Sequence, residues 1–203
     1  MSDNPLNTPL PVISRHQINP DKPLPTITDR KIVARTRFFG VEQVDLTFAN
    51  GQTREFERMA GKGRGAVMIV PLIDEDHILL IREYGAGTHQ YELGFPKGLI
   101  DANETPFDAA NRELKEEAGY GANSLTELTK VSMAPTFFSA RMHIIIAREL
   151  YPEVLAGDEP EPLEVIKWPL DEIDSLLLRD DFTEARSMAA LLLIDKQRKK
   201  HKK

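Results

Sequence analysis

The chain of 203 residues contains no cysteine, which excludes disulfide bonds, zinc–thiolate sites and thiol nucleophiles. It also lacks any apolar run close to the roughly 20 residues that a membrane-spanning helix needs. The first residues do not show the basic-then-apolar pattern of a secretory signal peptide. We therefore expect a cytoplasmic protein without a membrane partner, and the missing cysteines are compatible with a reducing compartment.

Positive charge is scarce as well, because 26 Lys and Arg residues face 32 Asp and Glu residues and the formal net charge is −6. Binding to a nucleic-acid backbone needs an excess of basic residues, so we do not expect a nucleic-acid partner. The chain is 41% hydrophobic and 29% charged, which is typical of a soluble globular protein, and its length suits one domain with a substantial core. If such an acidic protein acts on an anionic substrate, bridging cations must offset the repulsion.

The most informative segment runs from Gly98 to Tyr120 and reads GLIDANETPFDAANRELKEEAGY. In a helix, the three- and four-residue spacings of Glu113, Glu116 and Glu117 place their carboxylates on one face. Like charges in such a cluster cost stability. Mg²⁺ prefers oxygen ligands and usually binds through carboxylates together with substrate phosphates. The cluster therefore indicates a metal site, with a solvated acidic helix as the alternative.

A helix is predicted from Pro106 to Ala118. Thr105 suits the N-cap, Pro106 suits the first helical position, and Gly119 suits the left-handed turn that ends a helix. An apolar stripe recurs at three- and four-residue steps beside the acidic face and should be buried: Phe107, Ala110, Leu114 and Ala118.

The segment resembles the Nudix box, in which Gly is followed by five residues, Glu, seven residues, and Arg-Glu-hydrophobic-any-Glu-Glu-any-Gly-hydrophobic. Those positions are filled by Gly98, Glu104, Arg112, Glu113, Leu114, Glu116, Glu117, Gly119 and Tyr120. Only Tyr120 departs, since an aliphatic residue is more usual there. The resemblance implies an α+β fold, with a mixed sheet between helices in an α/β/α sandwich. It also implies hydrolysis of a nucleoside diphosphate linked to a further group.

The same resemblance implies roles for the box residues. Glu113, Glu116 and Glu117 are expected to bind more than one Mg²⁺ ion, with Mn²⁺ as the alternative, and the backbone carbonyl of Gly98 is a further candidate ligand. Glu104 is expected to orient Arg112, which would clamp the acidic loop against the helix. Glu113, Glu116 and Arg112 are therefore the catalytic candidates of the box.

The general base is either a box glutamate or a glutamate in the acidic, proline-rich loop at residues 157–162. Within that loop Glu159 and Glu161 are both candidates. Glu161 is slightly favoured because it adjoins a predicted strand.

Residues outside the box indicate which branch of the Nudix family the chain resembles. Segments 81–84 and 91–98, together with Pro135, resemble ADP-ribose pyrophosphatases, although Gly94-Phe95-Pro96-Lys97 departs from their pattern. From about residue 30 to 195 the chain is most similar to the NudE-type ADP compounds hydrolases. That resemblance implies ADP-ribose, NADH and diadenosine polyphosphates as substrates, with release of AMP. The implied substrate-binding residues are Arg82, Glu92, Pro135 and Phe137.

Two other functions stay open from the sequence. One is a strict ADP-ribose or sugar-nucleotide pyrophosphatase. The other is a catalytically silent module that senses nucleotides, although such modules usually have a damaged box and this box is intact.

The expected organisation has four parts: a proline-rich extended or disordered leader at 1–28, an N-terminal antiparallel β-hairpin subdomain at 29–60, the hydrolase domain at 61–195, and a basic tail at 196–203. Strands are predicted in the hairpin subdomain at 35–39, 41–48 and 53–59, with Asn50-Gly51 as a turn. The last helices are predicted at 171–178 and 182–194, with Leu176, Leu192 and Leu193 buried. The family resemblance implies a homodimer in which this subdomain contributes to the partner's site.

Overall fold

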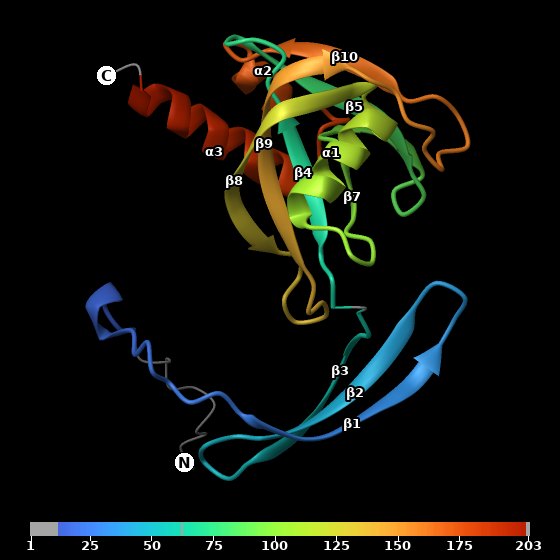
Figure 1. The fold of residues 1–203 in the computed structure, drawn as a ribbon. Coiled ribbons are helices and arrows are strands. Elements are labelled where there is room, and N and C mark those ends of the chain that lie inside the picture. The colour runs from blue at the N-terminus through green and yellow to red at the C-terminus, as the bar shows by residue number, and fades with distance from the viewer. Residues whose placement is uncertain (1–11, 62, 202–203) are drawn as a thin grey trace.

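Among the residues that the structure describes, two β-sheets and three α-helices form the body of the molecule, and a separate three-stranded sheet precedes the body in the chain (Figure 1). The structure is a computed structural model that describes residues 12–61 and 63–201. The larger sheet of the body has the order β7-β4-β9-β8, formed by Lys97–Leu99, Ala66–Pro71, Arg141–Pro152 and Tyr120–Ser132. The smaller sheet has the order β10-β5-β6, formed by Glu164–Pro169, His77–Gly85 and Gln90–Gly94.

The larger sheet is mixed, because β4 and β9 run parallel while its other neighbouring strands are antiparallel. The central strand β4 reads AVMIVP and is buried on both faces. Val67 and Ile69 pack on the side of α1 (Pro106–Glu117), whereas Met68 and Val70 pack on the opposite side. A strand buried on both faces is expected to read as a continuous apolar run. The predicted mixed sheet between helices is confirmed.

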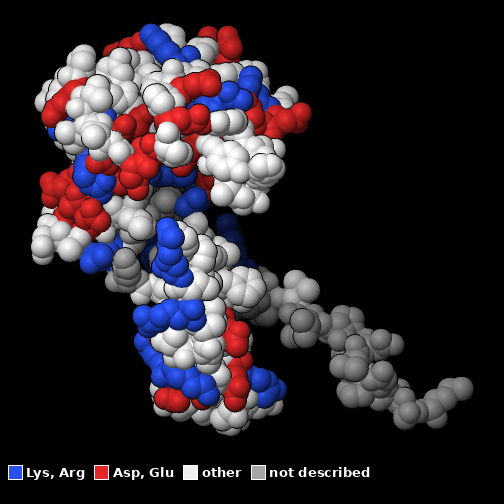
Figure 2. Space-filling view, turned by 90° about the vertical axis from the view of Figure 1, so that its right-hand side faces the viewer, with Lys and Arg blue, Asp and Glu red and all other residues white. Residues whose placement is uncertain are grey.

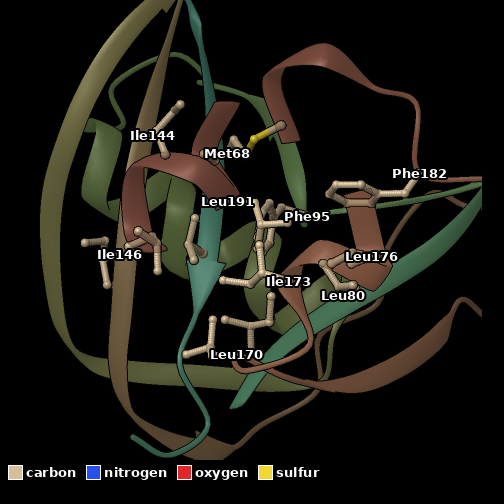
Figure 3. Packing of buried hydrophobic residues seen from close by; sticks show 14 of the residues in the cluster. Met68, Leu80, Phe95, Ile144, Ile146, Leu170, Ile173, Leu176, Phe182 and Leu191 are labelled. Carbon is tan, nitrogen blue, oxygen red and sulfur yellow. The ribbon is translucent and has the colours of Figure 1, made fainter. Parts of the chain in front are cut away.

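The larger hydrophobic cluster lies between the two sheets and helices α2 (Ile173–Leu177) and α3 (Ala185–His201), as Figure 3 shows. Its largest fully buried side chains include Phe95 and Phe182. Burial of one such side chain stabilises the fold by about 1.5–3 kcal/mol. The cluster therefore supplies much of the stability of the body.

The prediction of which leucines of α3 are buried was wrong. Leu191 and Ile194 are buried, while Leu192 and Leu193 remain 51% and 38% exposed. Leu176 is fully buried as predicted. The run Leu191-Leu192-Leu193 is apolar at every position, so only its packing partner determines which leucines face the core. Helix α3 also continues to His201, through most of the predicted basic tail.

Helix α1 begins and ends at the predicted signals. The hydroxyl oxygen of Thr105 accepts a hydrogen bond from the backbone N–H of Asp108, and the Asp108 carboxylate accepts one from the backbone N–H of Thr105. Gly119 follows the helix with φ of +72°. Ala110, Leu114 and Ala118 are buried, but the predicted burial of Phe107 is wrong, because it stays 42% exposed.

The N-terminal sheet consists of β1 (Thr26–Arg35), β2 (Gly40–Thr47) and β3 (Thr53–Met59), in that order. The Asn50-Gly51 turn joins β2 to β3, and Gly51 has φ of +80°. The strand predicted at 35–39 is wrong, because the chain turns at Thr36, whose hydroxyl oxygen accepts a hydrogen bond from the backbone N–H of Phe39. The sheet meets the body where the Met59 N–H donates to the Phe137 carbonyl oxygen at 2.8 Å.

Of the predicted leader, residues 1–11 lie outside the described residues, and β1 already begins at Thr26. The sequence patterns did not indicate β6 or β7, which are short and contain glycine. No helix within residues 12–61 and 63–201 combines the length and apolarity that crossing a membrane would require.

Candidate active site

The acidic segment folds around a cavity of about 500 Å³. The end of β5, strand β7, helix α1 and the loop that follows β9 contribute its walls. Seven carboxylates line the cavity, those of Glu83, Asp101, Glu113, Glu116, Glu117, Asp158 and Glu159, against the two cations Lys97 and Arg112. This excess of negative charge makes the cavity suited to positive ions rather than to an anion alone.

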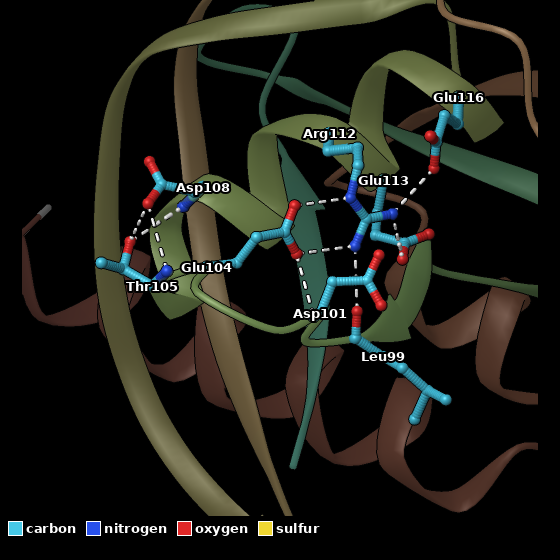
Figure 4. A network of polar contacts seen from close by, with 8 residues as sticks. All are labelled: Leu99, Asp101, Glu104, Thr105, Asp108, Arg112, Glu113 and Glu116. Atoms are coloured by element: carbon cyan, nitrogen blue, oxygen red, sulfur yellow. Dashed lines mark hydrogen bonds and ion pairs between the residues drawn. The ribbon is translucent and has the colours of Figure 1, made fainter. Parts of the chain in front are cut away.

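Arg112 connects the helix to the preceding loop (Figure 4). Its Nε and Nη2 atoms donate to the two carboxylate oxygens of Glu104 at 2.7 and 3.0 Å, and Nη2 also donates to the Leu99 carbonyl oxygen at 3.0 Å. Its Nη1 atom donates to Glu113 at 2.8 Å and to Glu116 at 2.9 Å. Hydrogen bonding to Glu104 raises the pKa of Arg112, and the same contact lowers the pKa of Glu104. The predicted contact between Glu104 and Arg112 is therefore present, and both side chains remain charged.

Glu117 is the most buried carboxylate of the cluster, with 6% of its surface exposed. Burial raises its pKa to about 8, although the charge of Lys97 and a 2.7 Å hydrogen bond from the Lys97 backbone N–H oppose this rise. Burial also raises the pKa of Glu113, and the neighbouring charges of Glu116 and Glu159 add to the effect. In both carboxyl groups the effect of burial outweighs that of the nearby cations, and carboxyl groups with pKa values shifted in this way are typical of functional sites.

Gly98 lies directly against Glu113. A methyl group on Gly98 would lie 1.9 Å from Glu113 Oε1, far inside van der Waals contact. Only glycine therefore lets the backbone of β7 approach this carboxylate so closely.

The donor set fits a hard divalent cation, because the carboxylates of Glu113, Glu116 and Glu117 and the adjacent Gly98 backbone present only oxygen donors. Within the described residues, no three such groups already surround a common point. Arg112 Nη1 bonds both Glu113 and Glu116, while Glu117 is bonded by the Lys97 backbone N–H. An ion bound by these carboxylates would compete with those contacts.

The acidic loop places its two glutamates differently. Glu159 lines the cavity, and its carboxylate folds back over Gly157, where an added methyl group would lie 2.1 Å from Glu159 Oε2. That same position is 3.6 Å from the Cβ atom of Glu116. Glu161 does not line the cavity and accepts a hydrogen bond from the Tyr91 hydroxyl. Position therefore favours Glu159 over Glu161, the reverse of the order that the sequence suggested.

Two of the predicted substrate residues lie on β5 and β6, and neither of them lines the acidic cavity. Arg82 forms an ion pair with Glu164 at 3.1 Å, and its guanidinium lies 5.0 Å from the centre of the Tyr91 ring. Glu92 lines a second cavity of about 490 Å³, where it accepts hydrogen bonds from Gln90 and Thr183. The hydrogen bond from Gln90 makes the largest contribution to lowering the pKa of Glu92.

The other two predicted substrate residues lie elsewhere. Pro135 and Phe137 are exposed on the loop between β8 and β9, next to the N-terminal sheet, and neither lines the acidic cavity. Phe137 is 58% exposed. The structure therefore brings together box residues, Lys97 and Glu159 around the acidic cavity, whereas none of the four predicted substrate residues lines it.

Sequence reasoning assigned no role to Lys97 or Glu83, which form an ion pair at 2.5 Å. Both line the acidic cavity and also the second cavity, so this pair stands between the two. A signal was available, because Lys97 directly precedes Gly98 and Glu83 directly follows Arg82. Neither position belongs to the box itself.

Comparison with known proteins agrees with this geometry. The model of the NUDIX domain matches residues 62–192, which contain the whole acidic cavity, and the chain belongs to the Nudix family. Members of this family generally use divalent metal ions. More narrowly, residues 25–58 match the model of the NudE-type Nudix hydrolase N-terminal domain. The predicted resemblance to this branch is confirmed.

Individual relatives point to the same branch. The chain is 58% identical over 170 residues to the ADP compounds hydrolase NudE of Escherichia coli (strain K12), covering 84% of this chain and 91% of that protein. A crystal structure of an ADP compounds hydrolase superposes with a TM-score of 0.81 at 56% identity, covering 87% of this chain and 95% of the other. The ADP-ribose pyrophosphatase of Bacillus subtilis (strain 168) is 28% identical, covering 80% of this chain and 91% of that protein.

Replacing Gly98 with alanine should weaken binding of divalent ions by about 10-fold, because the new methyl group displaces the Glu113 carboxylate. Binding of Mn²⁺ can be followed by electron paramagnetic resonance, with circular dichroism as a check of folding. Gly87→Ala is the matched control, since its added methyl group would meet nothing within 4 Å. Equal Mn²⁺ affinity in the two variants would contradict the importance of this close approach.

Proposed function

We propose that this chain hydrolyses the pyrophosphate bond of small molecules that contain ADP, such as ADP-ribose, NADH and diadenosine polyphosphates, and releases AMP. The observation that carries the proposal is the intact acidic cluster, held by Arg112 around one cavity. The ADP compounds hydrolase NudE supports the substrate class, because it is 58% identical over most of both chains.

Glu113, Glu116 and Glu117 are the proposed ligands of more than one Mg²⁺ ion, with Mn²⁺ as a substitute, and the Gly98 backbone is a further candidate. When bound, such ions neutralise phosphoryl charge and lower the pKa of a coordinated water. Arg112 would then hold the ligand-bearing helix and the loop in register through Glu104 and Leu99. Its donors are directed to protein oxygens, which makes it an orienting group rather than a substrate contact.

Lys97 is better suited to contact a phosphate. Its ammonium group has three N–H donors, and the pair with Glu83 at 2.5 Å occupies one of them. Its side chain is 26% exposed at the wall shared by the two cavities. Arg82 and Glu92 are proposed to act on this same side of the site, toward the part of the substrate that lies beyond the pyrophosphate.

Glu159 is the proposed general base, because it lies in the acidic cavity beside Glu116. In hydrolysis, the oxygen of water attacks a phosphorus atom of the pyrophosphate, and the bond from that atom to the bridging oxygen breaks. The proton of the water passes to the base. Pro135 and Phe137, exposed beside the N-terminal sheet, are proposed to contact substrate only at the outer edge of the site.

Substrate profiling tests the proposed activity. With Mg²⁺ present, the purified chain should release AMP from ADP-ribose, NADH and diadenosine triphosphate, and excess chelator should stop all three reactions. Chromatographic measurement of AMP is sufficient. Turnover of ADP-ribose or sugar nucleotides alone would favour the narrower pyrophosphatase, which the similarity to the Bacillus subtilis enzyme supports. Binding of ADP-ribose without any turnover would indicate a sensing module instead.

Glu116→Gln should lower turnover by at least about 100-fold, the upper figure for replacing a group that only orients a metal ligand. Removing one negative charge from a repulsive cluster should leave the fold intact, which thermal unfolding can verify. Glu75→Gln, an exposed glutamate in the turn between β4 and β5, is the matched control. Near-normal turnover by Glu116→Gln would remove Glu116 from the set of ligands.

A homodimer in the cytoplasm is the proposed working form. The N-terminal sheet supports it, because Ile27, Ile32, Val33 and Phe56 are each between 39% and 45% exposed on strands β1 and β3. Figure 2 shows basic side chains along this sheet, below a body that carries many acidic ones. Sedimentation at micromolar concentration should give twice the mass of 22.9 kDa, and a single-chain mass would reject the dimer.

A further inference from the structure

We propose that Tyr91 is a positioning residue that fastens the acidic loop through Glu161 and thereby holds Glu159 in the cavity. The inference rests on the proposed hydrolytic function and assigns the two glutamates of the loop different tasks. Glu159 faces the reacting groups, whereas Glu161 is the attachment point.

The other attachments of the loop lie toward its two ends, where Glu153 pairs with Lys115 at 2.9 Å and Leu163 packs against the hydrophobic cluster beneath α1. Between β9 and β10 the chain has no regular secondary structure from Glu153 to Leu163. At its start the Leu155 N–H donates to the Lys115 carbonyl oxygen of α1 at 3.2 Å. At its end Glu164 enters β10 and pairs with Arg82. Glu159 lies between these anchors, and the Tyr91–Glu161 contact is the attachment nearest to it along the chain.

Tyr91 is 41% exposed, but its backbone and ring have defined partners. It lies in β6 and pairs with Tyr84 of β5, and the two rings meet edge-to-face at 5.8 Å between centroids. The Arg82 guanidinium lies 5.0 Å from the centre of the Tyr91 ring and is in turn bonded to Glu164. The hydroxyl that reaches the loop therefore projects from a sheet rather than from a mobile segment.

The contact has the chemistry of a strong attachment. A phenol that donates to a carboxylate makes a charge-assisted hydrogen bond. Consistent with this, the hydrogen bond to Glu161 raises the pKa of Tyr91, so the donor keeps its proton. Pro160 and Pro162 flank Glu161 and restrict the backbone on both sides, so that fixing Glu161 also restricts Glu159.

Glutamine at position 161 separates attachment from catalysis. Its amide oxygen still accepts the hydrogen bond of Tyr91, but the side chain cannot act as a base. Alanine at the same position removes both properties. Tyr91→Phe removes only the hydroxyl and keeps the ring against Tyr84 and Arg82.

The experiment measures kcat and KM for ADP-ribose with Mg²⁺ in the full chain. Tyr91→Phe and Glu161→Ala should each lower kcat by about 10-fold with a smaller change in KM, since they displace the base but not the substrate contacts. Glu161→Gln should retain the kcat of the unmutated chain, whereas Glu159→Gln should lose most turnover. The double variant Tyr91→Phe/Glu161→Ala should lose no more than either single variant, because both remove one contact.

A second measurement does not depend on turnover. Hydrogen–deuterium exchange of residues 153–163 should become faster in Tyr91→Phe and Glu161→Ala, but not in Glu161→Gln. Glu75→Ala is the control, because Glu75 is exposed in the turn between β4 and β5 and lies outside the segment whose exchange is measured.

The outcomes distinguish failure of the attachment role of Tyr91 from failure of the proposed hydrolytic function. If Glu161→Gln is as inactive as Glu159→Gln, Glu161 takes part in catalysis and the attachment role is overturned. Full activity with unchanged exchange in Tyr91→Phe would overturn it as well. If the unmutated chain hydrolyses no ADP compound, the proposed function fails, while the exchange measurement still decides whether Tyr91 fastens the loop.

Discussion

The contact set of Arg112 is the interaction on which the rest of the site depends. One guanidinium joins Glu104 and the Leu99 carbonyl oxygen on the loop to Glu113 and Glu116 on the helix. Without this cation, the partly buried carboxylates would repel one another and the loop would lose its contacts with the acidic face of the helix. The guanidinium geometry matters, because a single lysine could not bond four oxygen-bearing partners in fixed directions.

Helix α1 could be predicted from the sequence because the signals that define it are local. The Thr105 cap, Pro106, Gly119 and the spacing of the glutamates all act within a few residues, so helix α1 and its acidic face could be predicted. In contrast, Leu192 and Leu193 were wrongly predicted to be buried, because a run of three leucines does not indicate which of them faces the core. Tertiary packing against the sheet selects which of them are buried.

The positions that sequence reasoning could not supply depend on distant parts of the chain. Lys97 and Glu83 meet only because β7 and β5 lie in neighbouring sheets, and Glu161 meets Tyr91 across 70 residues of sequence. Glu159 and Glu161 look equivalent in an acidic loop, yet one lines the cavity and the other does not. Phe137 illustrates the reverse case, since its carbonyl oxygen accepts a hydrogen bond from Met59 of the N-terminal sheet and not from a residue of the cavity.

Strand β4 separates the interior into two hydrophobic clusters, one on each face of the strand. Val67 and Ile69 support the helix that carries the acidic cluster, whereas Met68 and Val70 belong to the core beneath α2 and α3. Because close-packed interiors transmit strain, a change of volume in the second cluster also reaches the first through β4, the strand that they share. Phe95 makes the link direct, since it belongs to the α3-side cluster, donates through its backbone N–H to the Ser187 hydroxyl oxygen on α3, and lies three residues before Gly98. Evolution on the α3 side is therefore constrained by the geometry of the site as well as by stability.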